Sequence, residues 1–267
     1  MDIKYKTAEE IESIRVSSLL VSETLAHVAQ FIKPGVTTLE LDKSAEDFIK
    51  SKNAIAAFKG FKGFPGTLCI SVNAEVVHGI PTKRVVRDGD VLSVDCGVIQ
   101  NGWYGDSAYT FGVGQIDQSD IQLLQVTQQC LMQGIAKVKV GNRMGDVSSA
   151  IQEYAELHKM GVVRELIGHG IGRNLHEKPD VPNYGSRGQG INLKAGLVIA
   201  IEPMINKGKR GIKFHDDGWT VTTIDMKNSA HFEHTVAVTQ NGYDVLSSFE
   251  PIQSAIEKNI NIYNINV

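Results

Sequence analysis

The sequence is short of cysteine, and the cysteines it has stand far apart. Only Cys69, Cys96 and Cys130 occur in 267 residues, and no two of them form a CxxC pair. The odd number and wide spacing argue against a disulfide scaffold and against a zinc site built from cysteines. We therefore expect the protein to work in a reducing compartment, the cytoplasm.

An excess of positive charge and long hydrophobic runs are also missing. The chain has 27 Lys and Arg and 30 Asp and Glu, which gives a net charge of −3. It therefore has no overall positive electrostatic field that would favour binding of a specific nucleic acid or an anionic membrane. No apolar run approaches the roughly 18 residues that cross a bilayer. Residues 1–15 are charged throughout, unlike a secretory signal. With 42% hydrophobic and 21% charged residues, the composition predicts a soluble globular protein.

Helical periodicity appears in two pairs of segments. Thr and Glu are spaced as helix capping boxes at 7–10 and 37–40, and apolar residues follow each box at three- and four-residue steps. Ser and Gln at 119–122 predict the start of a third helix, which runs to about residue 138. A fourth helix follows the glycine at 145.

The two helix pairs suggest an internal repeat. The turn at 33–35 and the turn at 139–141 both end in glycine, and each half reads helix, turn, helix, then strands. We expect one domain over 1–267, with halves at about 8–115 and 116–248 and a C-terminal tail at 249–267. The alternative is that two helical hairpins look alike by chance.

Apolar and β-branched runs predict the strands. They occupy 67–72, 91–99, 103–113, 197–205 and 232–239. We therefore expect an α+β fold in which helices cover one face of a curved, mainly antiparallel sheet. Polar and apolar residues alternate over 259–266, which fits either a further strand or a mobile tail.

The turn Asn101-Gly102 fixes the register of one hairpin. Asn-Gly is the favoured two-residue hairpin loop, and using it pairs residues whose numbers sum to 203. Asp106 then lies opposite Gly97, and Asp95 lies two residues from Gly97 on the same face. The two carboxylates are diagonal neighbours, about 7–8 Å apart at Cα, and can converge on a shared ligand.

Two more acids interrupt apolar strands. Glu202 ends the run 197–201, and Glu233 stands between Phe232 and the strand that begins at Thr235. Buried carboxylates need a partner, and no lysine or arginine lies beside them in these strands. Any one acid could be a solvent-facing strand residue. Four of them together favour a metal cation as the counter-ion.

Histidines supply further candidates. His169 and His176 lie in the glycine-rich segment GHGIGRNLH, seven residues apart, which excludes the helical HExxH site. The segment alone could be a mobile loop. His78, in VVHGIP, fits a structural role as well as a catalytic one. The basic residues of 207–213 fit a solvated loop or a contact with a weakly acidic partner.

Four segments taken together resemble a known family. VDCGVIQNGWYGDSA, GHGIGRNLHEKP, AIEPMI and FEHT, in this order, are similar to the signatures of the methionine aminopeptidases, type I, in their short bacterial form. The similarity covers about residues 8–248. It implies the pita-bread α+β fold with two pseudo-symmetric halves.

The resemblance also implies a metal centre and a mechanism. Two divalent ions, cobalt, manganese, iron or zinc, would be held by five residues: Asp95, Asp106, His169, Glu202 and Glu233. Asp106 and Glu233 would bridge the ions, Asp95 would bind one ion, and His169 and Glu202 the other. A metal-activated hydroxide would hydrolyse the first peptide bond. Glu202 would transfer the proton, and His78 and His176 would bind the substrate or its oxyanion.

By the same resemblance, an apolar pocket would receive the methionine side chain. Its residues would be Phe61, Phe64, Cys69, Leu175 and Trp219, which could equally be ordinary core. Leu175 stands where the family often has an aromatic residue, and Gly97 where it often has a hydroxyl residue. These departures affect the shape of the pocket.

The leading hypothesis is removal of the initiator methionine from nascent proteins. The expected partners are N-terminal Met-peptides and nascent chains, and the protein is expected to be a monomer. Whether loop 207–213 makes a transient ribosome contact is left open. The alternatives are an Xaa-Pro aminopeptidase or dipeptidase of the same fold, which usually carries a whole amino-terminal domain, and a non-catalytic binding protein, which should have lost ligands.

Overall fold

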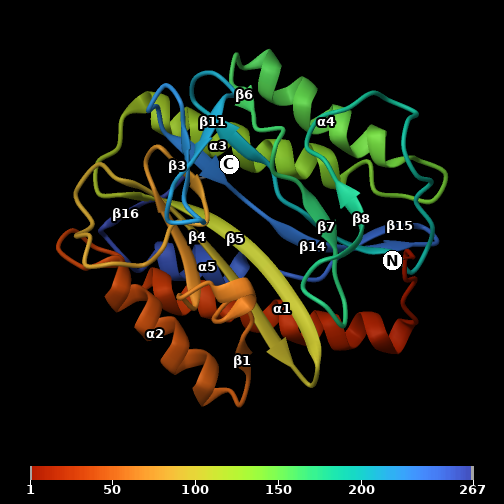
Figure 1. The fold of residues 1–267 in the computed structure, drawn as a ribbon, viewed down its shortest axis with the longest axis horizontal. Helices are drawn as coiled ribbons and strands as arrows, with labels where there is room; N and C mark the ends of the chain where they lie inside the picture. The colour runs from red at the N-terminus through yellow and green to blue at the C-terminus, as the bar shows by residue number, and fades with distance from the viewer. Residues whose placement is uncertain (1, 266–267) are drawn as a thin grey trace.

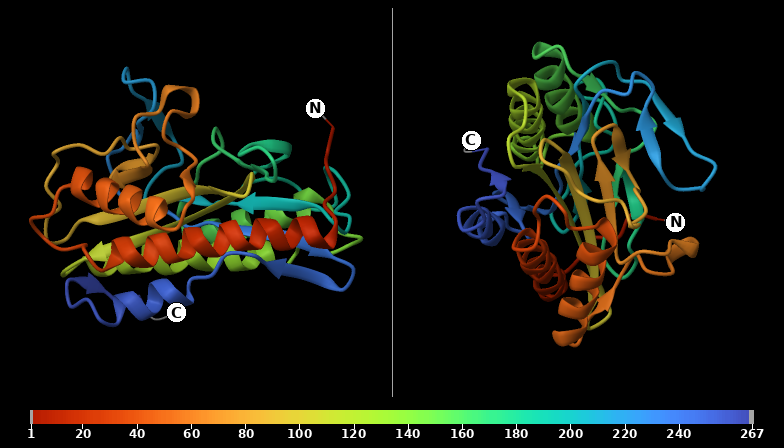
Figure 2. Two further views of the ribbon diagram at one scale, coloured as in Figure 1. Left: turned by 90° about the horizontal axis from the view of Figure 1, so that it is seen from below. Right: turned by 90° about the vertical axis from the view of Figure 1, so that its left-hand side faces the viewer.

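The described residues form five α-helices. They lie mainly on one side of the strands (Figures 1 and 2). The computed structural model describes residues 2–265. The helices are α1 (Ala8–Ala29), α2 (Thr38–Ser51), α3 (Gln118–Ile135), α4 (Met144–Leu157) and α5 (Glu250–Ile256). In Figure 2, α1 runs along the helical side, and long loops project from the opposite side. None of the helices in residues 2–265 is long and apolar enough to cross a membrane.

The helix starts test the capping predictions. Both predicted boxes are confirmed: the Thr7 hydroxyl accepts the Glu10 N–H and the Glu10 carboxylate accepts the Thr7 N–H, and the box at 37–40 repeats this pattern. The third predicted helix is confirmed as α3, but its predicted cap is wrong. The residue before α3 is Asp117, which makes no side-chain cap, and Ser119 lies inside the first turn.

The strands are short except for one long hairpin. They are β1 (Ile55–Ala56), β2 (Leu68–Val72), β3 (Glu75–Val77), β4 (Val91–Gln100), β5 (Trp103–Val113), β6 (Gly161–Val162), β7 (Gly168–Gly170), β8 (Glu177–Val181), β9 (Val198–Ile201), β10 (Met204–Asn206), β11 (Ile212–Phe214), β12 (Val221–Thr223), β13 (Ser229–His231), β14 (His234–Thr239), β15 (Gly242–Val245) and β16 (Ile262–Tyr263). A 3₁₀ turn, η1, covers Phe61–Gly63.

All the named strand pairs are antiparallel. One larger sheet has the order β1-β4-β5-β16, with β2 also paired to β4, and the other has the order β15-β14-β9-β7-β8. Two three-stranded sheets, β13-β10-β6 and β11-β12-β3, complete the set. The predicted α+β class, with helices over antiparallel sheets, is confirmed.

One predicted strand is divided in two, and another begins two residues later than predicted. The run 197–205 forms β9 and β10, and Glu202 and Pro203 lie between them. The run 232–239 begins with two residues outside any strand, which separate β13 from β14. Proline cannot donate to a strand ladder, which accounts for the first break. Both breaks contain one of the acids that the sequence pattern singled out.

The hydrophobic core lies between the long hairpin and the helices. Leu92, Val94, Cys96 and Val98 alternate along β4 and are fully buried in one cluster with residues of α1, α3 and α4. The alternate residues of β4, among them Asp95, face the other way. Packing of the apolar face against helices therefore leaves the opposite face of β4 and β5 free to carry polar groups.

The C-terminal segment contains structure that the sequence pattern did not resolve. Helix α5 follows Phe249 and packs against α1, and the Gln253 amide donates to the Tyr109 hydroxyl at 2.6 Å. Strand β16 pairs with the end of β5, Ile262 opposite Val113. Of the two alternatives for 259–266, a strand holds for 262–263, and Asn266 lies outside the described residues.

Replacement of Gly105 by alanine should destabilise the protein. Gly105 lies in β5 where helix α1 crosses it, and a Cβ atom there would overlap the backbone of Ser17 and Ser18. Overpacking of a tight core contact typically costs about 1–3 kcal/mol. We expect a loss of about 2 kcal/mol in the free energy of unfolding, measured by urea denaturation.

Gly185→Ala is the matched control. Its new methyl group would lie 3.3 Å from Ser148 Cβ, a contact that a small shift relieves. Its cost should be well below that of Gly105→Ala. Equal costs at the two positions would contradict the role of Gly105 in the α1–β5 contact.

Candidate metal centre

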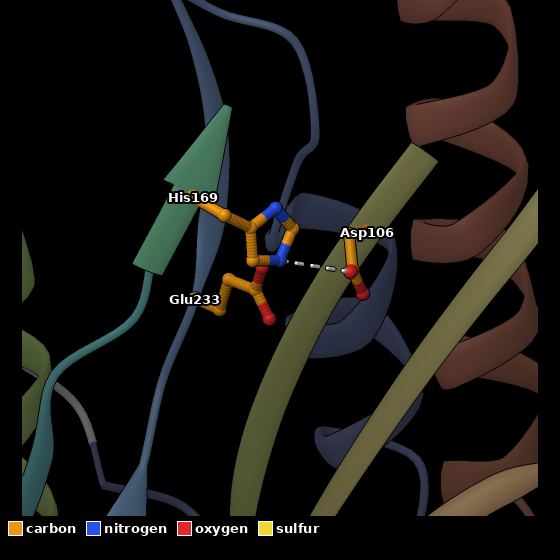
Figure 3. A group of neighbouring side chains, drawn as sticks. All are labelled: Asp106, His169 and Glu233. Atoms are coloured by element: carbon orange, nitrogen blue, oxygen red, sulfur yellow. Dashed lines mark ion pairs between the residues drawn. The ribbon is translucent and has the colours of Figure 1, made fainter. Parts of the chain in front are cut away.

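All twelve residues predicted for the site line one cavity of about 190 Å³. Five acidic or imidazole side chains lie at one part of it and come from both large sheets and the segment joining β13 to β14. They are Asp95 on β4, Asp106 on β5, His169 on β7, Glu202 after β9 and Glu233 after β13. Figure 3 shows Asp106, His169 and Glu233 pointing toward one another.

The aspartates are positioned by the hairpin register, which is as predicted. Gln100 pairs with Trp103 around the Asn-Gly turn, so Gly97 lies opposite Asp106 and Asp95 lies opposite Ala108. Both carboxylates consequently leave the same face of the hairpin. The prediction of the register from the turn alone is confirmed.

The glutamates are positioned by the two strand breaks, which lie opposite each other. Ile201 pairs with His234 on one side of the breaks, and Met204 pairs with His231 on the other. The strand pairing is interrupted only between these two pairs of residues. Glu202 and Glu233 lie within the interruption, one on each side of it.

Hydrogen bonds connect Glu233 and Thr235 to β5. Glu233 N–H donates to Ala108 O at 3.0 Å, the Ser107 hydroxyl donates to Glu233 O at 2.6 Å, and the Thr235 hydroxyl donates to Asp106 O at 2.8 Å. The acids of the two sheets are thereby brought to one place.

His169 presents a lone pair to the carboxylates. Its Nδ1 lies 2.9 Å from Gly170 O, and because a carbonyl only accepts, Nδ1 carries the hydrogen. Nε2 is then an acceptor. It lies 3.8 Å from Asp106 Oδ2 and 3.6 Å from Glu202 Oε1, atoms that also only accept when ionised. Ligand atoms of Asp106, His169 and Glu233 lie within 4.8 Å of one another, a spacing suited to a shared cation.

Burial and mutual repulsion make the ionised acids costly without a cation. Burial raises the pKa of Asp95 to about 7. Burial and the Asp95 charge raise the pKa values of Asp106 and Glu202 well above normal, and burial with the Asp106 charge does the same for Glu233. Burial lowers the pKa of His169 to about 3, so this imidazole is neutral.

Unpartnered oxygens point to the same need. The buried atoms Asp95 Oδ1, Asp106 Oδ1 and Glu233 Oε1 have no hydrogen-bond partner within the described residues. Buried polar atoms are normally satisfied, and oxygen-rich donor sets with one imidazole suit divalent ions. These residues therefore fit a divalent metal.

His176 and His78 border the centre as neutral imidazoles. The His176 ring centroid lies 4.2 Å from that of His169, and the His78 ring lies 6.2 Å from that of Trp219. Burial, followed by the Lys62 charge, lowers the pKa of His176 to about 4, and burial lowers the pKa of His78. Each can donate or accept a hydrogen bond toward the cavity.

The apolar wall of the cavity adjoins the acids. It contains the five predicted pocket residues, Phe61, Phe64, Cys69, Leu175 and Trp219, and two that sequence reasoning missed, Phe58 and Lys62. Gly97 is explained by Phe58: a Cβ at position 97 would lie 2.6 Å from Phe58 Cε1. The phenyl ring of Phe58 thus occupies the space that a side chain at 97 would need.

A buried ion pair holds the loop that carries Leu175 and His176. Lys6 Nζ donates to Glu177 Oε2 at 2.8 Å, and both side chains are buried. Glu177 Oε1 accepts the N–H groups of Arg173 and Asn174. The loop is therefore tied at its far end to the segment before α1. The sequence pattern contained no signal for a contact between residues so far apart.

Sequence reasoning also missed two groups around Glu202. The Asn183 amide donates to Glu202 O at 3.0 Å. His231 is buried, and its Nε2 lies 3.9 Å from Glu202 Oε2. Burial lowers the pKa of His231 to about 3. Its position two residues before Glu233 is the only sequence signal that could have pointed to it.

Comparison with known proteins identifies the relatives of this chain. Residues 12–240 match the family described as metallopeptidase family M24. "Methionine aminopeptidase 1" of Bacillus subtilis is 49% identical over 242 residues, which are 91% of this chain and 98% of that protein. The crystal structure of methionine aminopeptidase from Rickettsia prowazekii superimposes with a TM-score of 0.92 at 43% identity, covering 92% of this chain and all of that one.

A more distant likeness concerns the fold alone. The Xaa-Pro dipeptidase of Bacillus anthracis has a TM-score of 0.73 at 19% identity, and 62% of that chain is covered. The fold is therefore shared by enzymes named for different substrates, and the arrangement of the cavity has to distinguish them.

Metal binding should stabilise the protein more at about pH 8 than at about pH 6. In the metal-free protein the pKa of Asp95 is raised to about 7, so the native state holds a proton that the unfolded chain has lost. Metal-free stability then falls as pH rises from the unfolded pKa toward about 7. A metal must displace any proton still bound, so its affinity rises over the same range. The measurement is the shift of Tm on addition of manganese.

Asp95→Asn supplies the control for this pH effect. The variant removes the titrating group, so the metal-free Tm should vary less between the two pH values than in the original protein. Equal Tm shifts on metal addition at both pH values in the original protein would contradict the role of the buried acids.

Proposed function

The chain belongs to the methionine aminopeptidases of metallopeptidase family M24, and on that premise we propose that it removes the N-terminal methionine of nascent chains at a two-metal centre. It is a metal-dependent hydrolase that acts on protein N-termini. The observation that carries the finer proposal is the cavity itself, in which five candidate ligands border an apolar pocket.

In this proposal Asp106 and Glu233 would be shared between two divalent ions. Asp95 would be a ligand of one ion, and His169 and Glu202 would be ligands of the other. The closeness of the Asp106, His169 and Glu233 donor atoms and the unpartnered oxygens support this assignment. Four carboxylates and one imidazole suit manganese, iron, cobalt or zinc, and cellular supply would decide among them.

The bound ions would activate a water molecule and polarise the first peptide carbonyl. The Glu202 carboxylate accepts the proton that the water loses and passes it to the leaving amine. Neutral His176 and His78 donate hydrogen bonds to the substrate carbonyl oxygen as negative charge develops on it. No covalent link between enzyme and substrate is required.

Phe61, Phe64, Cys69, Leu175 and Trp219 would hold the methionine side chain. An unbranched thioether adapts to an irregular apolar pocket, and its sulfur makes favourable contacts with aromatic rings. Phe64 and Trp219 already pack edge to face, with ring centroids 5.0 Å apart, and so present a preformed wall.

We extend the proposal to the organisation of the chain. Residues 1–267 form one catalytic domain with halves at about 8–115 and 116–248, because each half supplies ligands and neither holds a complete set. The enzyme works as a monomer. Exposed Lys209 and Lys213 are the cations available in loop 207–213 for a transient ribosome contact. Lys207 pairs with Asp120 at 2.8 Å, and exposed Arg210 lies 4.0 Å from Glu165.

Metal-loaded protein should release free methionine from Met-Ala-Ser. Leu-Ala-Ser should react more slowly, because a branched side chain fits the pocket less well, and Met-Pro-Ser should not react. Free amino acids are measured by chromatography. Cleavage of Met-Pro-Ser in preference to Met-Ala-Ser would indicate an Xaa-Pro peptidase. No methionine release with manganese, iron, cobalt or zinc would reject the proposal.

Glu202→Ala should abolish turnover while the fold persists. Loss of a general acid–base group typically costs about 10²–10⁴-fold in rate, and here a metal ligand is lost as well. Methionine release gives the rate, and circular dichroism checks the fold. Glu250→Ala, at an exposed glutamate in α5, is the matched control and should keep full activity. Activity retained in Glu202→Ala would remove Glu202 from proton transfer.

A further inference from the structure

His231 is a buried histidine of the site that the proposed mechanism does not use. It is the last residue of β13 and only 2% exposed. The next residue, Phe232, packs on the opposite side against Tyr109, with ring centroids 4.9 Å apart. The ring of His231 therefore lies on the same side as Glu233 and the candidate metal centre.

The backbone of His231 is held in place from β5. Thr110 Oγ1 accepts the His231 N–H at 2.9 Å and donates its own hydrogen to His231 O at 2.6 Å. Ser93 Oγ, 2.9 Å from Thr110 Oγ1, must then be the donor to Thr110, because the threonine hydroxyl has only one hydrogen. With Met204 paired to it on the other side, His231 cannot move its backbone freely.

The ring nitrogen Nε2 of His231 has no hydrogen-bond partner within the described residues. It lies 3.9 Å from Glu202 Oε2, whereas the other oxygen of that carboxylate, Oε1, lies 3.6 Å from His169 Nε2. Glu202 thus stands between two imidazoles. His169 Nε2 carries no hydrogen and cannot donate to it, which leaves His231 as the imidazole able to do so.

His231 is placed for contact with Glu202. Among the described residues, Glu202 is the one whose carboxylate oxygen lies within 4.0 Å of a His231 ring nitrogen. A buried donor left without a partner is costly, so closing the 3.9 Å gap between His231 Nε2 and Glu202 Oε2 to hydrogen-bond range is favourable.

We propose that His231 is a positioning residue whose Nε2–H donates to Glu202 Oε2. The bond fixes the plane of the carboxylate and leaves Oε1 directed toward the His169 side of the centre. The inference rests on the proposed function of Glu202 in proton transfer. Groups that orient metal ligands typically change activity or metal affinity by about 10–100-fold when they are removed.

The hydrogen bond itself is tested by NMR on the zinc-loaded protein with ¹⁵N-labelled histidine. We expect a slowly exchanging Nε2–H resonance that disappears in His231→Gln and is therefore assigned to His231. In Glu202→Ala this proton should exchange rapidly with water. A His231 ring protonated only at Nδ1, or an Nε2–H signal unaffected by Glu202→Ala, would overturn the proposal. This measurement does not depend on activity.

The consequence for catalysis is tested by a pair of variants. In His231→Leu, kcat for Met-Ala-Ser should fall about 10–100-fold with KM and bound zinc unchanged. His231→Gln should recover most of the lost kcat, because its amide can donate to Glu202. An unchanged kcat in the Leu variant, equal damage in the Gln variant, or loss of bound zinc in the Leu variant would overturn the positioning role.

His234→Gln serves as the structural control. His234 is equally buried, but its ring bonds to the Ser247 hydroxyl at 2.7 Å and stacks on Phe249, away from Glu202. It should lower Tm without the selective loss of kcat. If His231→Leu does not fold, the NMR result decides. If the original protein releases no methionine, the proposed function fails, while the contact between His231 and Glu202 is still measured by NMR.

Discussion

The centre of this molecule is governed by the cost of burying four carboxylates together. In a low-dielectric interior their mutual repulsion and lost hydration can be offset only by protons or by a cation. Burial of these acids raises the pKa of Asp95 and leaves carboxylate oxygens without hydrogen-bond partners among the described residues. The paired strand breaks, the hairpin register and the bonds from Ser107 and Thr235 all serve to hold the four acids in this otherwise unfavourable arrangement.

Local chemistry made part of this site predictable from the sequence. The Asn-Gly turn determines which residues of the hairpin face each other, so the shared face of Asp95 and Asp106 follows without any knowledge of the fold. The boxes at 7–10 and 37–40 are equally local. The convergence of Glu202 and Glu233 on these aspartates is not local. It depends on the ladder between β9, β10, β13 and β14, and the family resemblance, not periodicity, supplied it.

The failures of prediction have physical causes as well. Ser119 has the spacing of a cap, but the chain turns into α3 earlier, after Asp117. The runs that contain Glu202 and Glu233 are apolar enough to suggest unbroken strands. Pro203 accounts for the first break, and the second has no such local cause. Phe58 and the pair of Lys6 with Glu177 make contacts between distant segments, for which a single sequence holds no pattern. His231 is marked in the sequence only by its place two residues before Glu233.

The spread of the centre along the chain bears on how the protein becomes active during its own synthesis. Asp95 and Asp106 leave the ribosome long before Glu233. Lys6 is synthesised 171 residues before Glu177, its ion-pair partner. A half-made polypeptide therefore carries the acidic face of the hairpin without a complete ligand set. The set is complete only once the segment that carries Glu233 has been synthesised.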